Sequence, residues 1–205
     1  MTTALSNKSG KGITDGVISE LATFWDILPG RAEEVSAASK RMTDAIHGLD
    51  PAVSAATGLR DARMVVFSEG RQLLFATTFE TEWDHYIDDA ILVVGVGRFL
   101  DWMQHTVQGQ EIVAWAKTSG AEKFAQGDPE WEAIMKKATS QLKALLQKNQ
   151  CQAAGYFNAV SALTLPQIDR AQRVNQAFEQ VLDDPAAAEA LQQPALKPLL
   201  ELAAD

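Results

Sequence analysis

The residue best suited to chemistry in this sequence is His105, which ends the apolar and aromatic stretch FLDWMQH. An imidazole in apolar surroundings can be kept neutral, and a neutral ring can act as a general base or as an iron ligand. Asp101, four residues earlier, would share a helical face with it and could orient the ring. Arg98 is the nearest cation for an anionic group. The alternative is a buried histidine that hydrogen-bonds to the backbone, and the sequence leaves both interpretations open.

A second candidate is the acidic stretch TEWDHYIDD, residues 81–89. Its potential metal ligands on one helix face are His85, Asp88 and Asp89. The start of a helix explains the stretch as well, because Thr81 can act as the N-cap and Asp84 can complete a capping box. We therefore expect a capped helix, with the metal site as the weaker alternative. The side chains that could anchor this helix inward are Trp83, Tyr86 and Ile87.

The other histidine and the single cysteine have simpler explanations. His47 precedes Gly48 at the end of a predicted helix, where a partly positive imidazole suits the negative end of the helix dipole. Cys151 is the sole cysteine, which excludes an internal disulfide and a zinc site built on paired thiolates. It has no neighbouring base in the sequence that would activate it as a nucleophile.

Alternate positions on the predicted strands add side chains that could line one pocket with His105. Asn158 interrupts an apolar strand, so its amide needs partners and is a candidate to hold a substrate oxygen. The candidate catalytic residues are therefore His105, Asp101 and Asn158. The candidate cofactor contacts are His105, Arg98, Trp25, Phe75 and Tyr156. Tryptophan and tyrosine at such positions more often belong to the core, and that alternative stays open.

The elements that must position these residues follow from apolar periodicity. Strands are predicted over residues 17–28, 62–67, 72–79 and 152–161. Helices are predicted from residue 31 to about 49, from residue 81, from Asp128, and from Thr164 to residue 183. The predicted organisation is a flexible tail (1–15), the first part of a sheet domain (16–94), a mainly helical insertion (95–150), and a final strand with C-terminal helices (151–205).

This order of elements, βαββαβ with an interrupted last step, predicts an α+β fold of the ferredoxin-like type. Such a fold has an antiparallel sheet with helices on one face. The other face stays open unless the extra helices, a second copy of the chain or a ligand covers it.

Two stretches also resemble a known superfamily: ILPGRAEE at the first strand-to-helix turn, and LLFATTFETEWDHYIDD at the end of the hairpin. They are similar to the dimeric α+β barrels, which include antibiotic-biosynthesis-type monooxygenases, haem-degrading monooxygenases, chlorite dismutases and dye-decolourising peroxidases. The resemblance covers roughly residues 17–90 and 151–182. FLDWMQH also resembles a stretch with a similarly placed histidine in uncharacterised bacterial relatives. The resemblance implies a homodimer whose two sheets close into a barrel, with a pocket between sheet and helices in each subunit.

Composition excludes several classes of partner. The 205-residue chain has a formal net charge of −9 and no cluster of Lys and Arg, so neither nucleic acid nor an anionic membrane is expected as a partner. Its longest apolar run, residues 90–97, is too short to span a bilayer, and the N-terminus does not have the pattern of a signal peptide. We expect a cytoplasmic protein. Sequence motifs for nucleotide binding, the serine-hydrolase elbow and zinc proteases are missing.

The function predicted from these features is that of a monooxygenase-like or peroxidase-like oxidoreductase. It would act on a small apolar or aromatic molecule, with His105 as base or as ligand to the iron of a haem, the candidate cofactor. The alternative is a non-catalytic protein that binds a ligand or assembles as a dimer through its sheet face.

Overall fold

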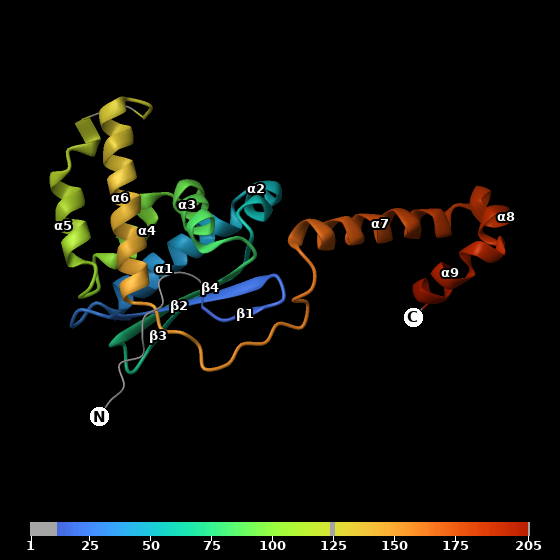
Figure 1. Cartoon of the computed structure of the whole chain (residues 1–205), viewed down its shortest axis with the longest axis horizontal. Helices are drawn as coiled ribbons and strands as arrows, with labels where there is room; N and C mark the ends of the chain where they lie inside the picture. The colour runs from blue at the N-terminus through green and yellow to red at the C-terminus, as the bar shows by residue number, and fades with distance from the viewer. Residues whose placement is uncertain (1–11, 124–125, 205) are drawn as a thin grey trace. The chain divides into compact units, whose positions relative to one another are not determined.

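The computed structural model describes residues 12–123 and 126–204 (Figure 1). It divides into two compact units at the boundary between Ala162 and Leu163. Most of the predicted tail, residues 1–15, lies outside the described residues. Among those that are described, no helix has the length and apolar character needed to cross a membrane.

The first unit is built on a four-stranded antiparallel sheet with the strand order β1-β2-β4-β3. The strands are β1 (Thr14–Asp15), β2 (Ile18–Asp26), β3 (Leu59–Phe67) and β4 (Gln72–Phe79). The predicted hairpin is confirmed, since β3 and β4 pair from Phe67 opposite Gln72. Its loop has positive φ values at Ser68, Glu69 and Gly70. Strand β2 pairs with β4 from Ser19 opposite Phe79 to Asp26 opposite Gln72, so β4 lies between β2 and β3.

Six α-helices and a short 3-10 helix belong to the described part of this unit. They are α1 (Ala32–His47), α2 (Pro51–Ala56), α3 (Trp83–Val94), α4 (Val96–Met103), α5 (Gln110–Thr118), η1 (Ala121–Lys123) and α6 (Pro129–Lys148). The start of α6 follows its sequence signal, because the Asp128 side chain accepts a hydrogen bond from the Glu130 N–H at 2.8 Å and a proline follows the cap. In Figure 1 these helices lie on one side of the sheet.

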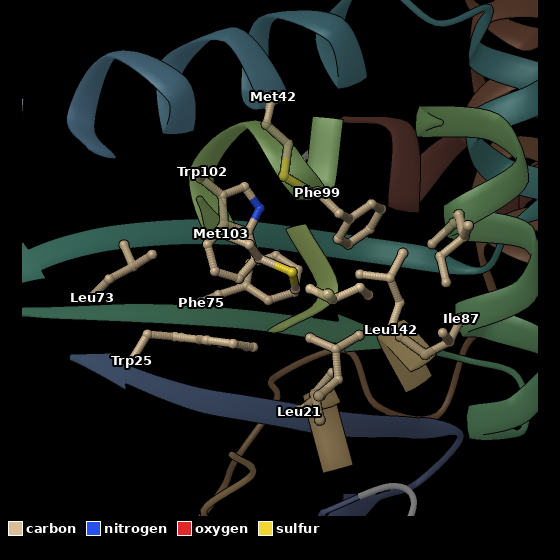
Figure 2. Packing of buried hydrophobic residues seen from close by; sticks show 14 of the residues in the cluster. Leu21, Trp25, Met42, Leu73, Phe75, Ile87, Phe99, Trp102, Met103 and Leu142 are labelled. Atoms are coloured by element: carbon tan, nitrogen blue, oxygen red, sulfur yellow. The ribbon is translucent and has the colours of Figure 1, made fainter. Parts of the chain in front are cut away.

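The core fills the layer between the sheet and these helices (Figure 2). Aromatic rings from strands and helices interlock there. The Trp25 and Trp102 ring centroids are 4.8 Å apart in an edge-to-face arrangement, and Phe79 stacks on Tyr86 at 4.2 Å. The apolar stripe of α1 contributes Val35 and Met42, both almost fully buried.

The α+β class and the antiparallel sheet are confirmed, but the ferredoxin-like strand order is not. Residues 152–161 form no strand, which corrects the prediction for this segment. Single hydrogen bonds tie this part of the chain to the sheet in place of a ladder. Just before the segment, Gln150 bridges to Thr23 and the Cys151 N–H donates to the Ala22 carbonyl at 2.9 Å, and at its end the Ser161 carbonyl accepts from the Val17 N–H at 2.9 Å. The same edge of β2 is used by two other segments. Its beginning pairs with β1, and directly after its end Ile27 bridges to Thr106. A continuous strand over residues 152–161 therefore cannot pair along the whole of this edge, because other segments occupy part of it.

The second unit consists of short helices after one long helix. They are α7 (Leu165–Asp183), η2 (Pro185–Ala187), α8 (Ala188–Leu191), η3 (Pro194–Leu196) and α9 (Lys197–Ala203). The predicted start of α7 is confirmed, because the Thr164 N–H donates to Gln167 Oε1 at 2.8 Å in a capping box. Its sequence also has an apolar stripe at helical spacing, which would be expected to pack inward, but α7 has no buried residue and Val174 is 60% exposed. So small a unit has few apolar residues to cover the stripe.

Candidate functional site

The side chains predicted to line one pocket are divided among three places. Trp25 and Phe75 belong to the closed core, where both rings contact Trp102, at centroid distances of 4.8 and 5.9 Å (Figure 2). Trp25 and Trp102 are fully buried, and Phe75 is 3% exposed. The layer between sheet and helices is thus filled by side chains at these positions. These residues do not fit around a porphyrin in this arrangement.

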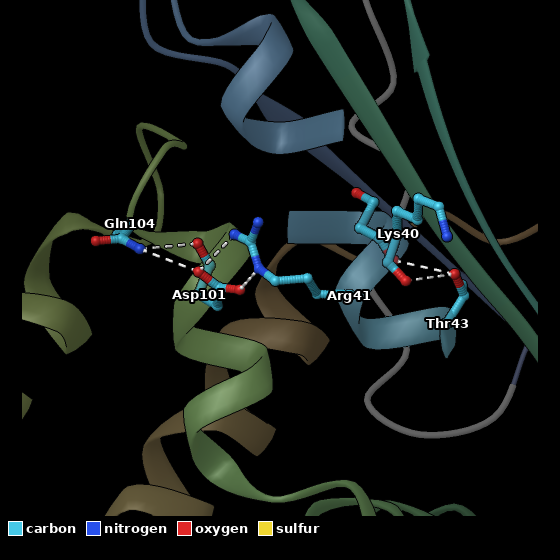
Figure 3. A network of polar contacts seen from close by, with 6 residues as sticks. Lys40, Arg41, Thr43, Asp101 and Gln104 are labelled. Carbon is cyan, nitrogen blue, oxygen red and sulfur yellow. Dashed lines mark hydrogen bonds and ion pairs between the residues drawn. The ribbon is translucent and has the colours of Figure 1, made fainter. Parts of the chain in front are cut away.

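Helix α4 positions Arg98 and Asp101, and Asp101 is oriented by α1 (Figure 3). Arg41 donates from Nε to Asp101 Oδ2 at 2.8 Å and from Nη2 to Oδ1 at 3.0 Å. Gln104 Nε2 donates to the Asp101 backbone carbonyl at 3.0 Å. The Arg41 hydrogen bonds lower the pKa of Asp101. The carboxylate that was predicted to orient His105 therefore binds a guanidinium.

His105 follows α4 and is half-buried. Its backbone N–H donates to the Trp102 carbonyl at 3.1 Å, and its own carbonyl accepts from the Leu28 N–H at 3.0 Å. The ring lies close enough to α1 to interact with Glu34. The pKa of Glu34 is lowered, chiefly because Arg31 Nη1 donates to it at 2.6 Å, with a smaller electrostatic contribution from His105. His105 thus lies near two carboxylates, those of Glu34 and Asp101.

Asn158 and Tyr156 lie on the segment that was expected to be a strand. The Asn158 N–H donates to Asp15 Oδ2 at 2.8 Å, and its side-chain oxygen accepts from the Val160 N–H at 3.0 Å. Its amide nitrogen reaches the Tyr156 hydroxyl at 3.4 Å. The amide therefore closes a local turn beside β1. In Figure 1 this segment runs on the side of the sheet away from the helices, so the structure does not bring Asn158 to α4.

The acidic stretch at residues 81–89 joins two helices. Lys143 of α6 contacts Asp84 at 3.1 Å and Asp88 at 2.9 Å, and lies 5.9 Å from the Trp83 ring centroid. Desolvation lowers the pKa of Lys143, but its hydrogen bonds to Asp88 and Asp84 outweigh this and raise the pKa overall. The inward anchors are confirmed: Trp83, Tyr86 and Ile87 are buried.

The predicted N-cap of this stretch is wrong, and its weaker alternative, a metal site, is not supported either. The N-cap of α3 is Glu82 and not Thr81, whose hydroxyl is buried with no hydrogen-bond partner among the described residues. His85 is exposed, and the described part of the chain contains no group of three or more His, Cys, Asp or Glu residues that could hold a metal ion. Asp84 and Asp88 instead form ion pairs with Lys143. The sequence did not indicate this contact, because α6 is distant along the chain.

A concavity of about 680 Å³ opens between the end of α3, α4 and α5. We call it the α4–α5 groove. Its lining residues are Val94, Gly95, Gly97, Arg98, Leu100, Asp101, Gln104, Val113, Ala116 and Lys117. Two predicted site residues, Arg98 and Asp101, therefore line one hollow, which His105 does not line. The contribution of α5 was missed, although Lys117 in its last turn follows an apolar stretch.

The face of the sheet away from the helices carries a second exposed feature, which we call the open sheet face: Phe24, Val65, Phe67 and Leu74. Leu74 lies opposite Phe24 on one side and Val65 on the other, so the three share a face. The Phe24 and Phe67 ring centroids are 6.2 Å apart, edge to face. Phe24 is 36% and Val65 43% exposed.

The ion pair of Asp101 supplies a test of its orientation. Because the folded-state pKa is below the unfolded value of about 3.9, the stabilisation is present above that pH and disappears as the pH falls through the folded-state pKa. Both side chains reach solvent, so Asp101→Asn should cost only about 0.5–1 kcal/mol at pH 7. Urea unfolding at pH 7 and at pH 3 should show a smaller difference at pH 3, which is already below the unfolded-state pKa of about 3.9. An equal difference at both pH values would contradict the assignment.

A comparison of the chain with protein-family models, with curated proteins and with solved structures finds no match.

Proposed function

We propose that this is a non-catalytic assembly protein in which the open sheet face joins two copies of the chain. The observation that carries the proposal is the edge-to-face pair of Phe24 and Phe67, partly exposed on a sheet surface that no described helix of the first unit covers. Apolar side chains that are contiguous on a sheet are typical of surfaces that are buried in a complex.

The surroundings of the open sheet face suit such a contact. Along the same strands Asp26, Asp61 and Arg63 are exposed, and register places them on the same side of the sheet. They would form a polar rim around an apolar centre, which is the usual anatomy of an interface. Two sheets that pack face to face lie about 10 Å apart and interdigitate their side chains, so a two-fold axis through this patch would bury both copies of Phe24.

We expect Phe24→Asp to shift the protein from dimer to monomer, because it would place two unpaired carboxylates in the apolar centre. The dissociation constant should rise at least about tenfold, measured by sedimentation equilibrium. Leu92→Asp is the matched control, since Leu92 of α3 is 82% exposed and lies on the helical side of the sheet. A monomeric mass for the unmodified protein at high concentration, or a dimer that tolerates Phe24→Asp, would contradict the proposal.

The oxidoreductase predicted from the sequence is the second candidate. Its support is the position of His105 directly after α4, half-buried and held at its backbone by hydrogen bonds to Trp102 and Leu28. Titration of haemin into the unmodified protein and into His105→Ala tests the haem-dependent form. A Soret shift in the unmodified protein alone would support it, and no shift in either would count against it.

A further inference from the structure

We propose that the α4–α5 groove binds a small amphipathic anion, a carboxylate attached to an aliphatic or aromatic body. The volume of about 680 Å³ lies in the range of small-molecule sites. The site is independent of the open sheet face, because none of the residues of that face lines the groove.

The floor of the groove is apolar and is formed by side chains of α3, α4 and α5. Val94 and Leu100 are partly buried and pack against the core cluster, and Val113 is 8% exposed. Ala116 completes the surface on the α5 side. An apolar body laid on this floor would remove both itself and these side chains from water, which is favourable in proportion to the area covered.

The rim of the groove has an excess of positive charge. Arg98 and Lys117 are exposed and, among the described residues, neither is in an ion pair. Asp101 is the single carboxylate in the lining, and both of its oxygens already accept hydrogen bonds from Arg41. A chain with a net charge of −9 therefore presents two exposed cations at the edge of an apolar hollow. A carboxylate placed between them would complement this charge.

Two glycines in the lining of the groove leave room for a ligand. A Cβ added at Gly95 or at Gly97 would meet no heavy atom within 4 Å, so the space in front of both is open. Gly97 lies within α4 and has no positive φ, which means that a larger side chain can replace it without backbone strain. Gly97→Leu would therefore obstruct the groove while α4 keeps its conformation.

The test uses octanoate as the probe, with 1-octanol and octylamine as neutral and cationic molecules of the same chain length. Amide NMR spectra of the full-length protein report where each binds. We expect saturable octanoate shifts at Gly97, Arg98, Val113 and Lys117, weakened by added salt. Octanol should bind at least about tenfold more weakly, the loss expected for one missing charge interaction.

Two variants distinguish the contribution of the cations to octanoate binding from that of the space in the groove. The double variant Arg98→Gln/Lys117→Gln should weaken octanoate about tenfold and leave octanol unchanged. Gly97→Leu should abolish both. Thermal unfolding must show that each variant is folded, and Phe24→Asp should bind octanoate as the unmodified protein does.

Several results would overturn the proposal. They are octanoate shifts outside the groove, equal affinity for octanol, octanoate binding that tolerates loss of both cations, or shifts of the groove amides that follow protein concentration without ligand. The last would identify a second copy of the chain as the occupant. Failure of dimerisation through the open sheet face would change none of these readouts.

Discussion

Trp102→Ala is expected to destabilise the first unit by about 3–5 kcal/mol, the cost of emptying the site of a buried tryptophan. Trp102 is fully buried and packs between strand and helix layers, with Trp25 at 4.8 Å and Phe75 at 5.9 Å from its ring centroid. Neither neighbour can close the cavity without breaking its own ring contacts. A typical domain has only about 5–15 kcal/mol of stability, so this change would remove a large share of it.

Urea unfolding followed by far-ultraviolet circular dichroism measures the effect. Phe157→Ala is the control, because Phe157 is 82% exposed and its truncation should change the stability by less than about 0.5 kcal/mol. If Trp102→Ala does not fold, Trp102→Phe retains part of the volume and should still be measurably destabilised. A loss below about 1 kcal/mol for Trp102→Ala would mean that the layer between sheet and helices is not closed. An open layer would leave space for a haem, and the haem hypothesis would be supported again.

The second large effect is expected at the ion pair between Arg60 and Glu80. Arg60 Nε lies 2.5 Å from Glu80 Oε1, and their side chains are only 11% and 9% exposed. Two charges removed from water are tolerable while each compensates the other. Glu80→Leu leaves the guanidinium buried without this partner, and removal of one member of a buried pair costs about 3–5 kcal/mol.

A double-mutant cycle isolates this pair. Arg60→Met with Glu80→Leu replaces both charges by apolar groups and should recover most of the stability that Glu80→Leu loses. The comparison pair is Lys40 and Asp44, which are 75% and 57% exposed, so Asp44→Ala should change the unfolding midpoint little. A coupling energy under about 0.5 kcal/mol for Arg60 and Glu80 would show that solvent reaches the pair.

Local patterns predicted much of the fold. The strand at residues 18–26, the hairpin and the starts of α6 and α7 follow from signals within a few residues of each other. Thr81 shows the limit of such signals, since the helix begins at Trp83 and its N-cap is therefore Glu82, one residue after Thr81. The strand prediction for residues 152–161 was wrong for another reason. Their alternation allows a strand, but pairing depends on a free edge that other segments partly occupy.

The candidate site was harder to predict because it depends on volumes and on distant partners. The sequence FLDWMQH is compatible with the wall of a pocket and also with a helix whose side chains fill the core. Once α4 forms, Phe99 and Trp102 turn into the layer against the sheet and fill it, while Arg98 and Asp101 turn out toward the groove. The partner of Asp101 is Arg41, sixty residues earlier in the chain. Neither fact can be read from spacing within the motif.

The edges of the sheet have a consequence for aggregation. A long strand with free N–H and C=O groups invites a strand from another molecule. The outer edge of β2 is occupied piecewise by β1, Gln150 and Thr106, so it offers no uninterrupted template. On the opposite edge, β3 carries Arg60, Asp61 and Arg63 and a register shift between Leu59 and Asp61. Charged side chains and irregular backbone both discourage intermolecular strand addition, so the two borders resist fibril growth by different means.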